Sequence, residues 1–215
     1  MLLAVCYGIC MGVYALSSRE EPEFRQMLAS AIKVPALLML TLVVTFPSLY
    51  VFNTLLGSRL TVTELARLLA SAMGVLVAVL AAFGPIVAFF SVTTISYAFI
   101  LLLNIVVFAV AGAFGLGYLQ RTLGQLIALD ASRRVSEATD DDEEFRTRLN
   151  RIDASLTRSV FSVWMAVFIL VGSQMSWVLR PFIGSPGKAF TWFRPRESSF
   201  FEAVLRSIRT LIAEG

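Results

Sequence analysis

The sequence contains no histidine, only two cysteines and few charged residues. Without histidine the chain lacks the commonest general base and the commonest metal ligand, so we expect no catalytic triad and no histidine-ligated metal. Cys6 and Cys10 lie one helical turn apart in an apolar segment, where a disulfide would strain a helix and two thiols alone would hold zinc poorly. We therefore expect no enzyme, no metal site and no cofactor, and interpret both thiols as packing groups.

Charged residues make up 15% of the 215-residue chain and hydrophobic residues 57%, against about 25% and about 45–50% in soluble domains. No charged residue occurs from Leu68 to Gln120. As a single helix this stretch would be more than twice as long as the roughly 30 Å hydrocarbon core of a bilayer, so it must fold back on itself. The composition predicts an all-α fold, a polytopic transmembrane helical bundle.

Five apolar stretches predict about five membrane spans: residues 1–16, 34–56, 68–90, 98–119 and 160–179. The first would reach only about 24 Å and lacks the features of a signal peptide, so we expect the chain to begin inside this span. Residues 17–33 should form a polar connection that ends in Lys33 as an interfacial anchor. Thr61 or Thr63 should cap the helix before the third span, and the hydroxyl-rich residues 91–97 should form the reversal after it.

Prolines interrupt two of the predicted spans. Pro47 should kink or break the second helix because proline lacks a backbone donor, and the Thr45 and Ser48 hydroxyls could satisfy the freed backbone groups. Gly84 and Pro85 should bend the third span late. Such interruptions can line a transport cavity, but prolines also occur in membrane helices that merely bend, and the halves of the chain show no inverted repeat.

Residues 120–158 are the one long polar segment, with eight acidic and seven basic residues. Apolar residues recur at helical spacing around the acidic run 140–144, which predicts a helical hairpin outside the membrane. The acidic run lacks the glycine and alternating spacing of a calcium loop, so we interpret it as a helix start. Basic residues are divided equally between the two sides of the membrane, and we place the hairpin in the cytoplasm because a long charged connection is easiest to leave untranslocated.

The C-terminal region combines an interfacial loop with an amphipathic helix. Ser199 and Glu202 have the spacing of a capping box, and the apolar residues that follow share one helix face, which should lie on the membrane or against the hairpin. The predicted organisation is helices one to four in 1–119, the hairpin in 120–158, helix five with an exit motif in 159–184, and the loop and amphipathic helix in 185–215.

The sequence QMSWVLRPFIG, residues 174–184, closes the fifth span. Gln174 could reach a neighbouring helix or an interfacial water, and Trp177 and Arg180 share one helix face. There the indole could anchor at the interface while the guanidinium extends toward a phosphate. Pro181 should force the chain out of the membrane. We interpret the stretch as a membrane exit rather than a catalytic site, with Gln174, Trp177 and Arg180 as candidate contacts to lipid or a partner.

Five further residues are candidate helix–helix contacts: Gly8, Gly12, Asn104, Gly112 and Gly115. Small residues four apart allow close approach of membrane helices, and a buried amide can hydrogen-bond across them. We favour such structural contacts over substrate binding. No acidic residue lies in any predicted span, which weakens the case for an ion-coupled pump.

Three long stretches, KVPALLMLTLVVTFPSLYVFNTLLG, GPIVAFFSVTTISYAFILLLN and VGSQMSWVLRPFIGSP, resemble a family of polytopic inner-membrane proteins of bacteria that is functionally uncharacterised. The resemblance covers most of residues 33–196 and implies a multi-pass location in the bacterial cytoplasmic membrane, but no activity, cofactor or substrate. Members of that family have more residues before the first span. The five spans are also similar in topology alone to Yip1-type membrane-trafficking proteins.

Two functions from different classes remain at this point. The first, which we favour, is a non-enzymatic scaffold or subunit of a membrane complex, indicated by the glycine-rich helix faces, the charged hairpin and the amphipathic tail. The alternative is a transporter or channel for small solutes or ions with a cavity near Pro47, Pro85 and Asn104. The expected partners are the lipid bilayer and other membrane proteins or further copies of this chain, and no nucleic acid, because the basic residues are not gathered on one element.

Overall fold

The computed structural model describes residues 1–17, 24–55, 61–94, 96–136, 162–179, 181–183, 191–192 and 200–214. Within these ranges the chain forms six helices and no strand. The helices are α1 (Leu2–Ser17), α2 (Phe24–Leu55), α3 (Val62–Thr93), α4 (Tyr97–Ser136), the helix Ser162–Val178, and α6 (Phe200–Glu214). The all-helical architecture predicted from composition is confirmed for these residues.

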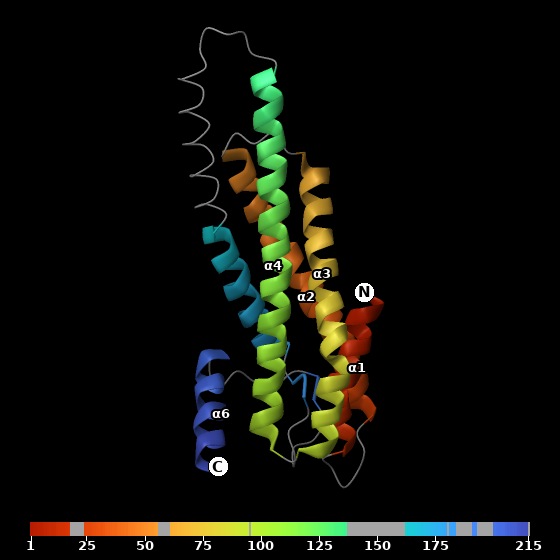
Figure 1. Cartoon of the computed structure of the whole chain (residues 1–215). Helices are drawn as coiled ribbons and strands as arrows, with labels where there is room; N and C mark the ends of the chain where they lie inside the picture. The colour runs from red at the N-terminus through yellow and green to blue at the C-terminus, as the bar shows by residue number, and fades with distance from the viewer. Residues whose placement is uncertain are drawn as a thin grey trace.

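The helices pack lengthwise into a bundle (Figure 1). α1 lies between α2 and α3, α3 packs against α4, and α6 contacts α4 near the end at which α4 begins. The helix Ser162–Val178, drawn in teal, is joined to α2 and α4 by Trp164, which is fully buried in an apolar cluster with Leu49 and Leu119. Aliphatic and aromatic side chains therefore fill the space between all of the long helices.

Three helices are long and apolar enough to cross a membrane: Phe24–Val51, Val62–Thr93 and Tyr97–Leu126. Leu2–Ser17 and Ser162–Val178 are apolar but shorter. Large hydrophobic side chains also cover the outside of the long helices, as at Val43, Phe89 and Phe114, which are each at least 60% exposed. Large apolar side chains exposed along these helices suit lipid rather than water, so the helices support a membrane protein with three candidate spans.

Two predicted boundaries of the third helix agree with the structure. The hydroxyl of Thr61 accepts a hydrogen bond from the backbone N–H of Glu64, and the Glu64 carboxylate accepts one from the Thr61 N–H, which completes a capping box. At the other end, α3 stops at Thr93 and α4 begins at Tyr97, so the reversal occupies the hydroxyl-rich stretch.

The second helix begins earlier than the sequence predicts. α2 starts at Phe24, so residues 24–33 are helical and continuous with the second span, and they do not form a polar connection. Lys33 lies inside this helix with only 3% of its surface exposed, so its side chain is a contact within the bundle, and its position at the interface stays a prediction. Gln26, Ser30 and Lys33 face the protein interior, whereas Arg25 and the apolar residues Phe24 and Leu28 are exposed.

The prolines do not interrupt their helices. α2 continues through Pro47 and α3 continues through Pro85, so of the kink or break predicted at Pro47 the break does not occur. Beside Pro47, the Thr45 hydroxyl donates to the Thr41 carbonyl at 2.7 Å and the Ser48 hydroxyl donates to the Thr45 carbonyl at 2.7 Å. Local hydroxyl donors of this kind let membrane helices tolerate proline.

The fourth helix runs well past the predicted end of its span. α4 has 40 residues and continues to Ser136, about 60 Å in length, so the first part of the predicted hairpin is a direct extension of the fourth span. The returning part of that hairpin lies outside the described residues.

Candidate functional site

The chain does not leave the bundle where the fifth helix ends. That helix ends at Val178, and Leu179 and residues 181–183 are buried. Phe182 is 9% exposed and Ile183 is 4% exposed, and both belong to the same apolar cluster as α1 and the middle of α3. The stretch after Pro181 therefore packs into the protein, which differs from the expected exit along the membrane surface.

A non-helical stretch buried in a bundle needs donors for its carbonyl groups. α2 supplies three of them. The Gln26 side-chain amide donates to the carbonyl oxygens of Pro181 at 3.2 Å and Phe182 at 3.0 Å. The Ser30 hydroxyl also donates to the Phe182 carbonyl, and the Lys33 ammonium donates to the Pro181 carbonyl at 2.9 Å.

Helical periodicity brings these three donors together. Gln26, Ser30 and Lys33 are separated by four and three residues, so they lie above one another on one face of α2. Each is almost completely buried, with exposed fractions of 1%, 0% and 3%. We call these three residues, with the carbonyl groups of Pro181 and Phe182, the α2 polar cluster.

Lys33 extends the α2 polar cluster to a second stretch of the chain. Its ammonium donates to the Trp192 carbonyl at 2.6 Å and lies 6.0 Å from the centre of the Trp192 ring, within the range of a cation–π contact. One lysine side chain therefore joins residues 181–183 and 191–192 to the second helix.

α1 packs against α2 beside the α2 polar cluster. A Cβ atom added at Gly8 would lie 2.6 Å from the Ser30 carbonyl oxygen and 2.7 Å from the Ala31 Cα, and one at Gly12 would lie 2.7 Å from the Met27 Cα. The missing side chains thus allow the two helix backbones to approach within contact distance. Both glycines were singled out by the sequence for such an approach, and the structure places them against the turn that carries Ser30.

A second polar contact joins α1 to α4. The Tyr7 hydroxyl donates to the Asn104 side-chain oxygen at 2.8 Å, and the Asn104 amide donates to the Ile100 carbonyl of its own helix at 2.8 Å. Tyr7 is fully buried and its ring also packs edge-on against Phe108 at 5.5 Å. The amide singled out by the sequence therefore forms a hydrogen bond between helices.

Of the two glycines proposed in α4, Gly115 lies against another helix of the described residues. An added Cβ at Gly115 would lie 3.0 Å from the Leu76 Cβ and 3.1 Å from the Ala72 carbonyl oxygen, both in α3. An added Cβ at Gly112 would meet no described atom within 4 Å. The described helices therefore make no close approach at Gly112, although it lies only one helical turn from Gly115, and a contact there stays a prediction.

The motif residues before Pro181 have less contact with the bundle. Gln174 is exposed and Trp177 is half-buried. Arg180 lies outside the described residues. The described residues of the motif that are buried are thus Leu179 and residues 181–183.

Sequence reasoning missed Gln26 and Ser30 and gave Lys33 a different role. The signal was present, since polar residues at positions i, i+4 and i+7 define one helix face. The charged residues just before Phe24 make the whole stretch resemble a loop, which hides this helix face in the sequence. The partners of that face are backbone carbonyl groups, which lie more than 140 residues away in the sequence.

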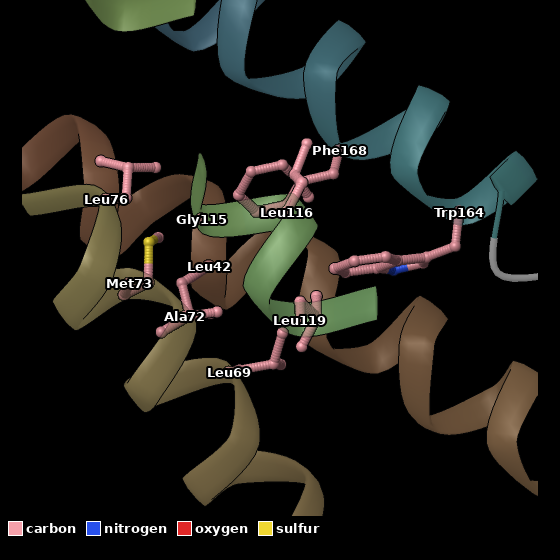
Figure 2. A pocket seen from close by; sticks show the side chains of 10 residues that line it. All are labelled: Leu42, Leu69, Ala72, Met73, Leu76, Gly115, Leu116, Leu119, Trp164 and Phe168. Carbon is pink, nitrogen blue, oxygen red and sulfur yellow. The ribbon is translucent and has the colours of Figure 1, made fainter. Parts of the chain in front are cut away.

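An apolar cavity of about 20 Å³ lies at the centre of the bundle (Figure 2). Its walls come from α2, α3, α4 and the helix Ser162–Val178, and include Leu42, Met73, Gly115, Trp164 and Phe168. This volume is about that of one water molecule, and the walls offer no polar surface, so the cavity is a packing defect. None of Pro47, Pro85 and Asn104 lines it.

Within the described ranges, no three side chains of His, Cys, Asp or Glu come together as a metal site would require. The cysteines are free thiols, with Cys6 exposed and Cys10 half-buried. The Cys10 sulfur would be the nearest atom, at 3.3 Å, to a Cβ added at Gly84, so it fills space beside α3.

No protein-family model, curated protein or solved structure matches the chain. The functional argument therefore depends on the arrangement of its own residues.

Proposed function

We propose that the protein is a multi-pass protein of the bacterial inner membrane that acts as a non-enzymatic scaffold or subunit of a membrane complex. Its spans would be the three long helices together with Leu2–Ser17 and Ser162–Val178, which pack beside them. The membership of the inner-membrane family suggested by the three long sequence stretches remains part of this proposal.

The α2 polar cluster is the observation that carries the scaffold role. Gln26, Ser30 and Lys33 are polar groups deep in an apolar bundle, which in membrane proteins usually mark the site of function. Here each of them donates a hydrogen bond to the backbone of residues 181–183 or 192, so the polar groups hold distant parts of the chain together. These hydrogen bonds hold the helices in one arrangement, as a scaffold for other proteins requires.

The surfaces available for attachment are the elements that extend from the bundle. α4 continues to Ser136, about ten residues past the end of its apolar part at Leu126. α6 leaves the apolar side chains Phe201, Leu205, Ile208 and Ile212 exposed in one stripe. On another face of α6, Arg206 and Glu202 form an exposed ion pair at 3.5 Å, so we propose an amphipathic helix that lies on the membrane.

The scaffold proposal is tested by replacing residues 137–158 with a short Gly-Ser linker. We expect the wild-type protein, extracted in mild detergent, to run as an assembly larger than one chain in native mass spectrometry. The linker variant should insert in the membrane and unfold at the same temperature, yet lose the assembly. A wild-type protein that is always a lone monomer would overturn the proposal.

A transporter remains the second candidate, and one observation favours it. Transporters often bind substrate where a membrane helix is discontinuous and its carbonyl groups face inward. The carbonyl groups of Pro181 and Phe182 are such groups, whereas the helices at Pro47 and Pro85 are continuous. Liposomes containing the protein should then carry an ion or solute flux. Absence of flux, with no aqueous labelling of a cysteine placed at Asn104, would count against transport.

A further inference from the structure

Lys33 is a charged residue far inside a candidate span. It lies nine positions after Phe24, where the span Phe24–Val51 begins, which corresponds to about 13 Å along the helix. The opposite face of this part of α2 exposes Phe24, Leu28 and Ile32, as a lipid-facing surface would. An ammonium group that is only 3% exposed is costly unless protein groups replace its water.

The groups that replace water around Lys33 include two peptide carbonyls and an aromatic ring. The Pro181 oxygen lies 2.9 Å and the Trp192 oxygen 2.6 Å from Nζ, with the Trp192 ring centre at 6.0 Å. Carbonyl oxygens replace the hydration shell of potassium in selective channels, and aromatic faces bind ammonium ligands. The same chemistry therefore surrounds the Lys33 ammonium.

Residues other than Lys33 hold the Pro181 carbonyl group and its neighbour in place. Gln26 donates to both the Pro181 and the Phe182 oxygen, and Ser30 donates to the Phe182 oxygen. Residues 181–183 are also buried by apolar packing against α1 and α3. The Pro181 side of the site is thus organised by contacts that do not depend on the lysine, which favours binding of a separate ligand there.

We propose that the carbonyl groups of Pro181 and Trp192, with the Trp192 ring, form an intramembrane binding site for small primary ammonium cations, and that Lys33 is its built-in occupant. The inference goes beyond the scaffold role, because it concerns the isolated protein and holds whether or not a partner is found. Because Lys33 already fills the site in the wild-type protein, added cations should not change the unfolding temperature of the wild type through this site.

The test restores the missing cation from solution. Lys33→Ala removes three methylene groups and the ammonium, which together correspond to n-propylammonium. In nanodiscs, we expect the variant to unfold at a lower temperature than the wild type, and millimolar n-propylammonium chloride to raise its Tm by roughly 3 °C or more, as expected for a ligand that binds only the folded state. The wild-type Tm should not respond.

Three controls decide the result. n-Propanol has the same shape without the charge, N-methylglucamine chloride matches the ionic strength, and Leu28→Ala changes an exposed residue of the same helix. Recovery by n-propylammonium alone, in Lys33→Ala alone, supports the site. An equal response to n-propanol or N-methylglucamine, a response in Leu28→Ala, or no response in Lys33→Ala overturns it.

A second variant keeps the test decisive if Lys33→Ala does not fold. Lys33→Met retains most of the aliphatic stem and leaves space for one heavy atom beside the two carbonyl oxygens. Ammonium chloride should then raise the Tm of Lys33→Met, and tetramethylammonium chloride, which is too large for that space, should not. Equal effects of the two salts, or none from ammonium, would contradict the proposal.

Discussion

At Gly8 the absence of a side chain sets the distance between α1 and α2, and so fixes the position of the α2 polar cluster. The atoms nearest to an added Cβ are backbone atoms of Ser30 and Ala31, which cannot rotate away as a side chain could. The Ser30 hydroxyl in turn holds the Phe182 carbonyl. A substitution at Gly8 should therefore alter the position of Phe182, near the end of the chain.

Gly8→Ala should destabilise the protein by about 1–3 kcal/mol, because the helices must separate or shift to admit the methyl group. The matched control is Gly112→Ala, where an added Cβ meets no described atom and helix propensity favours alanine by about 0.5–1 kcal/mol. Unfolding temperatures in nanodiscs compare the two, at about 2–4 °C per kcal/mol. Equal losses in both variants would show that close approach at Gly8 is unimportant.

The Tyr7–Asn104 hydrogen bond should show a modest energetic coupling. Tyr7→Phe and Asn104→Leu each remove one partner, and a double-mutant cycle isolates their interaction. Hydrogen bonds between membrane helices average about 0.6 kcal/mol and reach about 1.7 kcal/mol, so we expect a coupling in that range. Strict additivity of the two losses in denaturation measurements would mean that the bond contributes nothing.

Among the helices, the apolar spans and their caps could be predicted, and the polar faces could not. Apolarity is a property of one segment, so α3 and α4 and the Thr61 cap follow from local sequence. The start of α2 does not, because Gln26, Ser30 and Lys33 suit a helix only when a buried non-helical stretch accepts their hydrogen bonds. Residues 181–183 look in sequence like the point where the chain leaves the membrane, and only their distant partners keep them inside.

α6 gives a prediction about membrane contact. If its exposed stripe lies in lipid, a spin label at Leu205 should be more accessible to oxygen than to a water-soluble nickel complex, and a label at Arg206 should show the reverse. The labels are attached to single cysteines in a background with Cys6 and Cys10 replaced by alanine. Equal nickel accessibility at the two positions would place the stripe in water or against a protein partner.

In the whole molecule, the described contacts divide the chain into two parts that meet inside the bundle. The first part, α1 to α4, has its own apolar core around α1 and α3. The second part joins it through Trp164, whose indole donates to the Thr45 carbonyl at 3.3 Å, and through the carbonyl groups of Pro181, Phe182 and Trp192. These contacts require correct placement in the membrane but not a continuous chain between Ser136 and Ser162.

Two fragments, residues 1–136 and 159–215, should therefore associate when they are produced together in one membrane. Preformed membrane helices join through packing and a few hydrogen bonds, and this interface supplies both. Affinity purification of a tagged first fragment should recover the second. Gln26→Leu, which removes the donor to two carbonyl groups, should reduce that recovery several-fold, whereas Leu28→Ala on the exposed face should leave it unchanged. Fragments that insert but never co-purify, or equal recovery with Gln26→Leu, would show that the connection between the two parts holds them together and the polar cluster does not.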